Sequence, residues 1–142
     1  MIKPTYITDV KVPVIASPSL MINGWYGGKW MRFIGNRTVD YATKDNFAGF
    51  VLFGYKLRDE GIIPYQYENI HLDAKPAITI MVGGYFEFNN KAYDPLQVYN
   101  PNDKLYVDDN AVLTNVDTGF SSVGVVSATP QTNNNWLGAV LF

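Results

Sequence analysis

Short apolar segments separated by glycine, proline and asparagine run along the whole chain. They are rich in Val, Ile, Tyr, Phe and Thr, and none keeps the three-to-four-residue spacing of an amphipathic helix over three turns. This pattern predicts an all-β fold, either a β-sandwich or a small β-barrel in a single domain. The clearest predicted strands cover residues 31–34, 77–82, 85–88, 105–107, 111–114, 123–127 and 136–142.

Some of these segments carry more specific predictions. The nearly continuous apolar run at 47–55 predicts a strand buried on both faces, although a buried helical segment fits the same run. Gly83-Gly84 lies between two predicted strands and indicates a tight hairpin or a bulge with a sharp bend. Asp108-Asp109-Asn110 predicts the turn of a second hairpin. The apolar C-terminal segment must be paired or buried, because it would otherwise be an exposed, aggregation-prone edge.

The first 22 residues differ from the rest of the chain. Pro4, Pro13 and Pro18 cannot donate hydrogen bonds to a sheet, so the segment is expected to be irregular or to lie at a sheet edge. We therefore divide the chain into an extended N-terminal arm, residues 1–22, and a β-domain, residues 23–142. No repeat of fixed period stands out.

Composition narrows the function. The chain has 142 residues, of which 47% are hydrophobic and 17% charged, which suits one domain with a real core. A formal net charge of −2 argues against nucleic-acid binding through a basic face. Cysteine is absent, so there is no disulfide and no thiolate site. The N-terminal stretch is too interrupted for a signal peptide or a membrane span, so we expect a soluble protein made in a cytoplasm, without a membrane partner.

Catalytic candidates are few. His71 is the single histidine and lies near Glu68 and Asp73, where a carboxylate can orient it as a general base. No nucleophile motif accompanies it, and no pair of carboxylates stands out as an acid and base. The expectation is a non-enzymatic protein that needs no cofactor.

An acidic stretch near the second hairpin raises the question of a metal. Its oxygen-bearing side chains suit Ca²⁺, but their spacing does not match an EF-hand loop. Asx-rich turns explain the same residues without a metal, and we expect none. The residues concerned are Asp103, Asp108, Asp109 and Asn110.

A glycine-punctuated aromatic loop is the most distinctive local feature. Trp25, Tyr26 and Trp30 lie on it, between Gly24 and Met31. Such aromatics cap the domain's own core, fill a pocket on a protein partner, or stack on sugar rings. The glycosylation sequon Asn36-Arg37-Thr38 follows and is expected to be inert without secretion.

The second half of the chain, residues 78–142, resembles the bacteriophage head-decoration, or capsid cement, proteins. The matching segments are Asn102-Asp103-Lys104-Leu105-Tyr106-Val107-Asp108, Val112-Leu113-Thr114, Val123-Gly124-Val125-Val126-Ser127 and Leu137-Gly138-Ala139-Val140-Leu141-Phe142. Ala139 is an insertion relative to the family pattern, and residues 1–60 do not match it.

The resemblance implies a structural protein on the head surface of a virion. Its partners would be the major capsid protein and further copies of itself, as a homo-oligomer and most simply a trimer. The contact residues that we expect on the arm and the aromatic loop are Tyr6, Ile7, Val12, Trp25, Tyr26 and Trp30. Two alternatives remain open: a carbohydrate-binding β-sandwich of a fibre or receptor-binding protein, and a tail-tube or connector protein.

Overall fold

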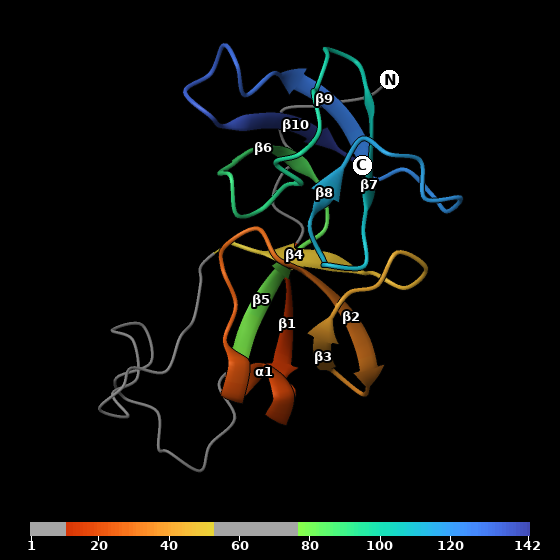
Figure 1. The fold of residues 1–142 in the computed structure, drawn as a ribbon. Helices are drawn as coiled ribbons and strands as arrows, with labels where there is room; N and C mark the ends of the chain where they lie inside the picture. The colour runs from red at the N-terminus through yellow and green to blue at the C-terminus, as the bar shows by residue number, and fades with distance from the viewer. Residues whose placement is uncertain (1–10, 53–76) are drawn as a thin grey trace, which may run out of the picture.

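The structure is a computed structural model that describes residues 11–52 and 77–142 (Figure 1). In these two ranges the chain forms a closed five-stranded barrel and a separate five-stranded sheet, with one short helix. The predicted all-β class is confirmed, and the barrel form is realised in the first half of the chain.

The barrel closes through pairing between its first and last strands. Its strand order is β1-β3-β2-β4-β5, and β5 returns to pair antiparallel with β1. The pairing of β1 with β3 is parallel, whereas the remaining neighbours are antiparallel. The strands are β1 (Lys11–Ala16), β2 (Trp30–Gly35), β3 (Thr38–Tyr41), β4 (Gly49–Val51) and β5 (Ala77–Met81).

A single turn-and-a-half of helix, α1 (Pro18–Asn23), follows β1 at the end of the barrel remote from the second sheet (Figure 1). The Ser17 side chain accepts a 3.1 Å hydrogen bond from the backbone N–H of Leu20, and Pro18 begins the helix. Gly24 ends it with a φ of 69°. Leu20 is buried in the core of the barrel, so the helix covers this end of the barrel.

The second sheet contains the C-terminal strands in the order β6-β10-β9-β7-β8, all antiparallel. The last strand, β10, lies between β6 and β9, so the apolar C-terminal segment is paired on both sides as predicted. The hairpin predicted around Asp108 to Asn110 is also confirmed, because β7 pairs with β8 across it. The strands are β6 (Gly84–Phe88), β7 (Lys104–Val107), β8 (Leu113–Thr114), β9 (Gly124–Ala128) and β10 (Leu137–Leu141).

Three barrel strands, β2, β4 and β5, contribute buried side chains to two hydrophobic cores at once. Successive side chains of a strand point to opposite faces. On β4, Val51 points into the barrel while Phe50 points into the core shared with the second sheet. Ile80 and Met81 divide in the same way on β5. The prediction of a strand buried on both faces is therefore correct for the β4 part of that run.

The prediction of an extended arm is wrong for residues 11–22, which form β1 and most of α1. Pro13 is accommodated because β3 pairs with β1 only from Ile15 onward, so the missing N–H of Pro13 interrupts no β1–β3 bond. Residues 1–10 lie outside the described part of the chain.

The glycine pair does not form a hairpin. The strands on its two sides belong to different units, since β5 closes the barrel and β6 pairs with β10. Gly84 has a φ of 116°, which glycine tolerates and other residues rarely adopt. The other alternative is correct for its bend, since the pair turns the chain from the barrel into the second sheet. The strand pairings around the pair record no bulge there.

Several predictions fall on residues 53–76, outside the described ranges, including the end of the 47–55 run and His71. Within the described ranges, no helix has the length and hydropathy needed to cross a membrane.

Candidate functional site

The aromatic loop divides between core and surface. Trp25 is 5% exposed and packs inside the barrel, and Trp30 is 3% exposed in the core shared with the second sheet. Only Tyr26, at 53% exposure, reaches solvent. The prediction of Trp25 and Trp30 as partner contacts is therefore wrong, because both side chains pack in the hydrophobic cores. The three aromatic side chains do not form one stacking platform.

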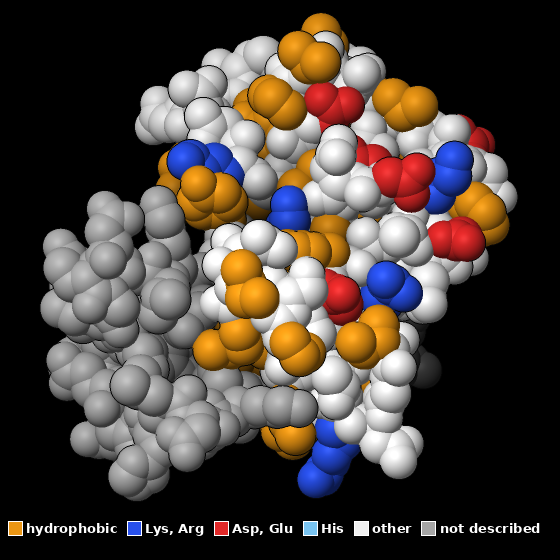
Figure 2. Space-filling model, turned by 60° about the horizontal axis from the view of Figure 1, so that its bottom comes forward, with side chains coloured by type: hydrophobic (Ala, Val, Ile, Leu, Met, Phe, Trp, Pro, Cys, Tyr) orange, Lys and Arg blue, Asp and Glu red, His pale blue; other side chains and the backbone are white. Residues whose placement is uncertain are grey.

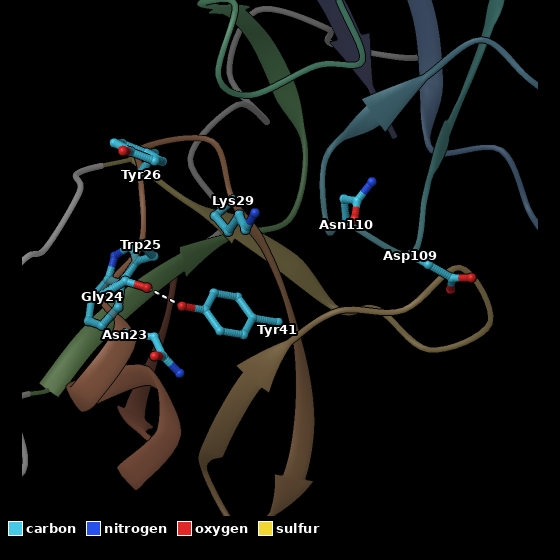
Figure 3. Close-up of a pocket in the computed structure, with 8 residues that line it drawn as sticks. All are labelled: Asn23, Gly24, Trp25, Tyr26, Lys29, Tyr41, Asp109 and Asn110. Atoms are coloured by element: carbon cyan, nitrogen blue, oxygen red, sulfur yellow. Dashed lines mark hydrogen bonds between the residues drawn. The ribbon is translucent and has the colours of Figure 1, made fainter.

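A cleft of about 400 Å³ lies where the end of α1 faces the β7–β8 turn (Figure 3). One wall comes from α1 and the loop after it, and β3 contributes Tyr41. The opposite wall is the turn between β7 and β8 (Figure 3). The lining residues are Asn23, Gly24, Trp25, Tyr26, Lys29, Tyr41, Asp109 and Asn110.

Tyr41 fixes one side of this cleft. Its hydroxyl donates a hydrogen bond to the carbonyl oxygen of Gly24, drawn as the dashed line in Figure 3. Burial, with a smaller contribution from the charge of Asp40, raises the pKa of Tyr41 above its ordinary value. Tyr41 therefore stays a neutral donor near pH 7, and the end of α1 is tied to β3.

Lys29 supplies the positive charge of the cleft. Its ammonium nitrogen lies 5.5 Å from the centre of the Tyr41 ring. Burial lowers the pKa of Lys29, and attraction to Asp108 opposes this shift without cancelling it. The ammonium is thus partly removed from water with incomplete compensation by neighbouring charges.

The acidic turn opposite Lys29 is organised by its own backbone. One carboxylate oxygen of Asp108 accepts from the N–H of Asn110 at 2.8 Å and from that of Val112 at 3.2 Å. Burial raises the pKa of Asp108, and these two hydrogen bonds oppose the rise. Asp109 forms an ion pair with Lys44 at 3.9 Å, and it also accepts from the Lys44 backbone N–H at 3.0 Å.

The acidic residues weighed as a calcium site do not converge. Asp103 accepts hydrogen bonds from the Asn100 N–H and from the Asn115 side chain, while Asp108 closes its own turn. Across residues 11–52 and 77–142, no group of three or more His, Cys, Asp or Glu side chains gathers in a way that would hold a metal ion.

The remaining predicted contact residues belong to the N-terminal segment. Tyr6 and Ile7 lie outside the described residues. The backbone of Val12 is part of β1, opposite Ile80 of β5. Val12 therefore belongs to a barrel strand and not to an arm that extends over neighbouring subunits.

A second surface feature crosses the outer face of the second sheet. Cross-strand pairing places Tyr85 of β6 opposite Val140 of β10, Val140 opposite Val125 of β9, and Val125 opposite Lys104 of β7. Phe142 follows Val140 by two residues and is exposed like it. We call Tyr85, Val125, Val140 and Phe142 the outer row.

Other exposed apolar side chains are spread over the molecule. On the face shown in Figure 2, hydrophobic side chains reach the surface at several separate places, with acidic and basic side chains between them. Isolated exposed apolar residues are ordinary on a protein surface. The outer row differs because Tyr85, Val140 and Val125 are neighbours across adjacent strands, and Phe142 follows directly after β10.

Sequence reasoning missed the cleft. No motif in the sequence singles out Lys29 or Tyr41. Asn110 was assigned to a turn, correctly, but nothing in the sequence brings it close to the end of α1. Neither the family models nor the curated proteins compared with the chain give a match.

Proposed function

We propose that this chain is a non-enzymatic structural protein of a phage particle that binds the outside of the capsid shell and stabilises it. The resemblance over residues 78–142 motivates the proposal, and the outer row is the observation that carries it. The major capsid protein is the partner, and further copies of this chain assemble beside it.

The outer row has the chemistry of a protein contact. Tyr85 is 51% exposed on the paired strand β6, and Phe142, directly after β10, is 74% exposed. Contiguous exposed apolar side chains on a rigid sheet mark interaction surfaces, and aromatic residues contribute most to such contacts. Lys104 and Glu87 flank the row, as polar residues do at the rim of an interface.

The scaffold suits adhesion. The barrel and the second sheet share a continuous hydrophobic core, so the outer row is held by packed strands and not by a loop. A rigid contact surface loses little conformational entropy on binding. Repeated copies on a symmetric shell then add weak contacts at high effective concentration.

Quantitative peptide mass spectrometry on purified phage particles tests the function. We expect a copy number that scales with that of the major capsid protein. A handful of copies per particle would contradict a decoration role and favour a tail-tube, connector or fibre component. Absence from the particles would overturn the proposal.

Co-sedimentation with shells stripped of this protein tests the surface. The double variant Tyr85→Ser, Val140→Ser should reduce binding about tenfold or more, because it removes two neighbouring apolar side chains of the outer row. Ile22→Ser is the control, since Ile22 is apolar and more exposed than either residue but lies on α1 at the far end of the barrel (Figure 1). Equal binding of the double variant and the wild type would remove the outer row from the contact.

A further inference from the structure

The cleft between α1 and the β7–β8 turn has binding capacity that the fold does not use. Within the described part of the chain, the Lys29 ammonium forms no ion pair, and it lies over the Tyr41 ring. An ammonium in this state gains from an anionic ligand, because the anion restores the stabilisation lost by partial burial.

The acidic wall does not cancel this charge. Asp109 already pairs with Lys44, and Asp108 directs its carboxylate to the N–H groups of its own turn. Burial lowers the pKa of Lys29 in spite of Asp108, in agreement with a cation that has too little compensation. The cleft therefore favours a ligand with one negative group placed at Lys29.

The other lining groups favour a sugar as the body of that ligand. Tyr26 offers an exposed aromatic ring, which Lys91 steadies with its ammonium 4.4 Å from the ring centre. The side-chain amides of Asn23 and Asn110 are exposed at the two walls (Figure 3). Aromatic rings pack on the C–H faces of sugars, and amides pair with hydroxyl groups as both donors and acceptors.

The size of the cleft agrees with this ligand. A volume of about 400 Å³ is at the lower end of small-molecule sites. We propose that this cleft binds a pyranose that carries a carboxylate, with Lys29 on the carboxylate, Tyr26 against the ring and the two asparagines on hydroxyls. The site is separate from the outer row, so the proposal does not depend on the capsid function.

Glucuronate and glucose form a matched pair of probes, because they differ only in the carboxylate. Amide chemical shifts of the purified chain are followed by NMR up to about 50 mM of each sugar, a range that detects binding as weak as about −4 kcal/mol, or about 1 mM. We expect glucuronate to move the amides of Asn23, Lys29 and Asn110. Glucose should move them much less at the same concentration.

Variants separate the contributions. Lys29→Met keeps the aliphatic stem and should weaken glucuronate about tenfold, whereas Lys104→Met removes an exposed lysine of β7 away from the cleft and should have no effect. Tyr26→Ala should also weaken binding, while Tyr85→Ala, at nearly the same exposure, should not.

Three outcomes would overturn the proposal. The first is the absence of shifts in the cleft at the highest glucuronate concentration. The second is binding that Lys29→Met leaves unchanged in a folded variant. The third is an equal response to inorganic phosphate, which would show an anion site without selectivity for a sugar. None of these bears on the abundance of the chain in phage particles.

Discussion

The backbone N–H of Trp30 donates a 2.8 Å hydrogen bond to the carbonyl oxygen of Ala111, and this bond joins the first residue of β2 to the turn between β7 and β8. The Trp30 carbonyl accepts from Ala42 at 3.0 Å, so both backbone groups are used. The centre of its indole ring lies 5.3 Å from the centre of the Phe50 ring. Trp30 therefore links the barrel to the second sheet through both its backbone and its side chain.

Trp30→Phe should cost less stability than the size of the side chain suggests. The indole N–H of Trp30 is buried and has no hydrogen-bond partner among the described residues. Such a donor carries a penalty of about 1–3 kcal/mol, which phenylalanine removes while it keeps most of the ring contacts. We expect a loss of under about 2 kcal/mol in the free energy of unfolding, measured by urea denaturation, against about 3–5 kcal/mol for Trp30→Ala. Equal losses for both variants would contradict this account.

Ser17→Ala tests the cap of α1. The buried Ser17 side chain accepts from the Leu20 N–H at 3.1 Å, and its removal leaves that donor unsatisfied. The expected cost is about 1 kcal/mol in the free energy of unfolding. Ser19→Ala is the control, because Ser19 is exposed and only accepts a long 3.4 Å bond from Asn23. The cap has no role if both variants unfold at the same urea concentration.

Much of the second sheet could be predicted from the sequence, because its strands are short, local and separated by turn residues. β9 and the β7–β8 hairpin follow the predicted segments to within a residue or two. The position of β1 could not be predicted in this way. Its partner β5 begins at Ala77, so the closure of the barrel depends on contacts between segments far apart in the chain.

The short helix shows a different limit. Ser17, Pro18 and Gly24 are the start and stop signals of a helix, and they are present in the sequence. The six residues between the two caps are too few to show the periodic apolar pattern by which a helix of three turns is predicted. Pro18 instead favours irregular structure when it is read from the sequence alone, although in the structure it begins α1.

The candidate site was predictable only in part. Its aromatic loop was singled out correctly, but the burial of Trp25 and Trp30 follows from the two cores on either side of the barrel wall. The cleft itself forms only because Tyr41 and Asn110 lie on the same side of the molecule as the end of α1. This arrangement depends on how the second sheet packs on the barrel, and no local sequence motif predicts it.

Gly124→Ala should weaken the pairing of β9 with β10. A Cβ atom at Gly124 would lie 2.2 Å from the carbonyl oxygen of Val140 and 2.9 Å from a methyl group of Leu141. Since the backbone oxygen cannot move aside without breaking the sheet, we expect a loss of about 2–3 kcal/mol in the free energy of unfolding.

Gly35→Ala is the matched control for this variant. A Cβ atom at Gly35 would meet nothing within 4 Å, and the expected change is within about 0.5 kcal/mol. Both variants are compared by thermal and urea unfolding. If Gly124→Ala is as stable as Gly35→Ala, β9 and β10 do not approach as closely as the structure shows.

Alkaline pH should reveal the contribution of Tyr99. Its ring is buried, and its hydroxyl donates to the carbonyl oxygen of Asp94 at 2.7 Å. Burial, followed by the negative charge of Asp94, raises the pKa of Tyr99 above its ordinary value. The folded protein therefore holds this proton where the unfolded chain, with a tyrosine pKa of about 10, releases it.

The sign of the effect follows from this difference. Stability that depends on the neutral phenol is fully present below about pH 10, and it is lost as the pH rises above that value. Tyr99→Phe has no proton to lose. It should be about 1 kcal/mol less stable than the wild type at pH 6 and pH 8, where tyrosine does not titrate. Near pH 11 the wild type should lose about 1.4 kcal/mol relative to the variant, so that the two become nearly equal. A difference that stays constant from pH 8 to pH 11 would mean that Tyr99 ionises as readily in the folded protein as in the unfolded chain.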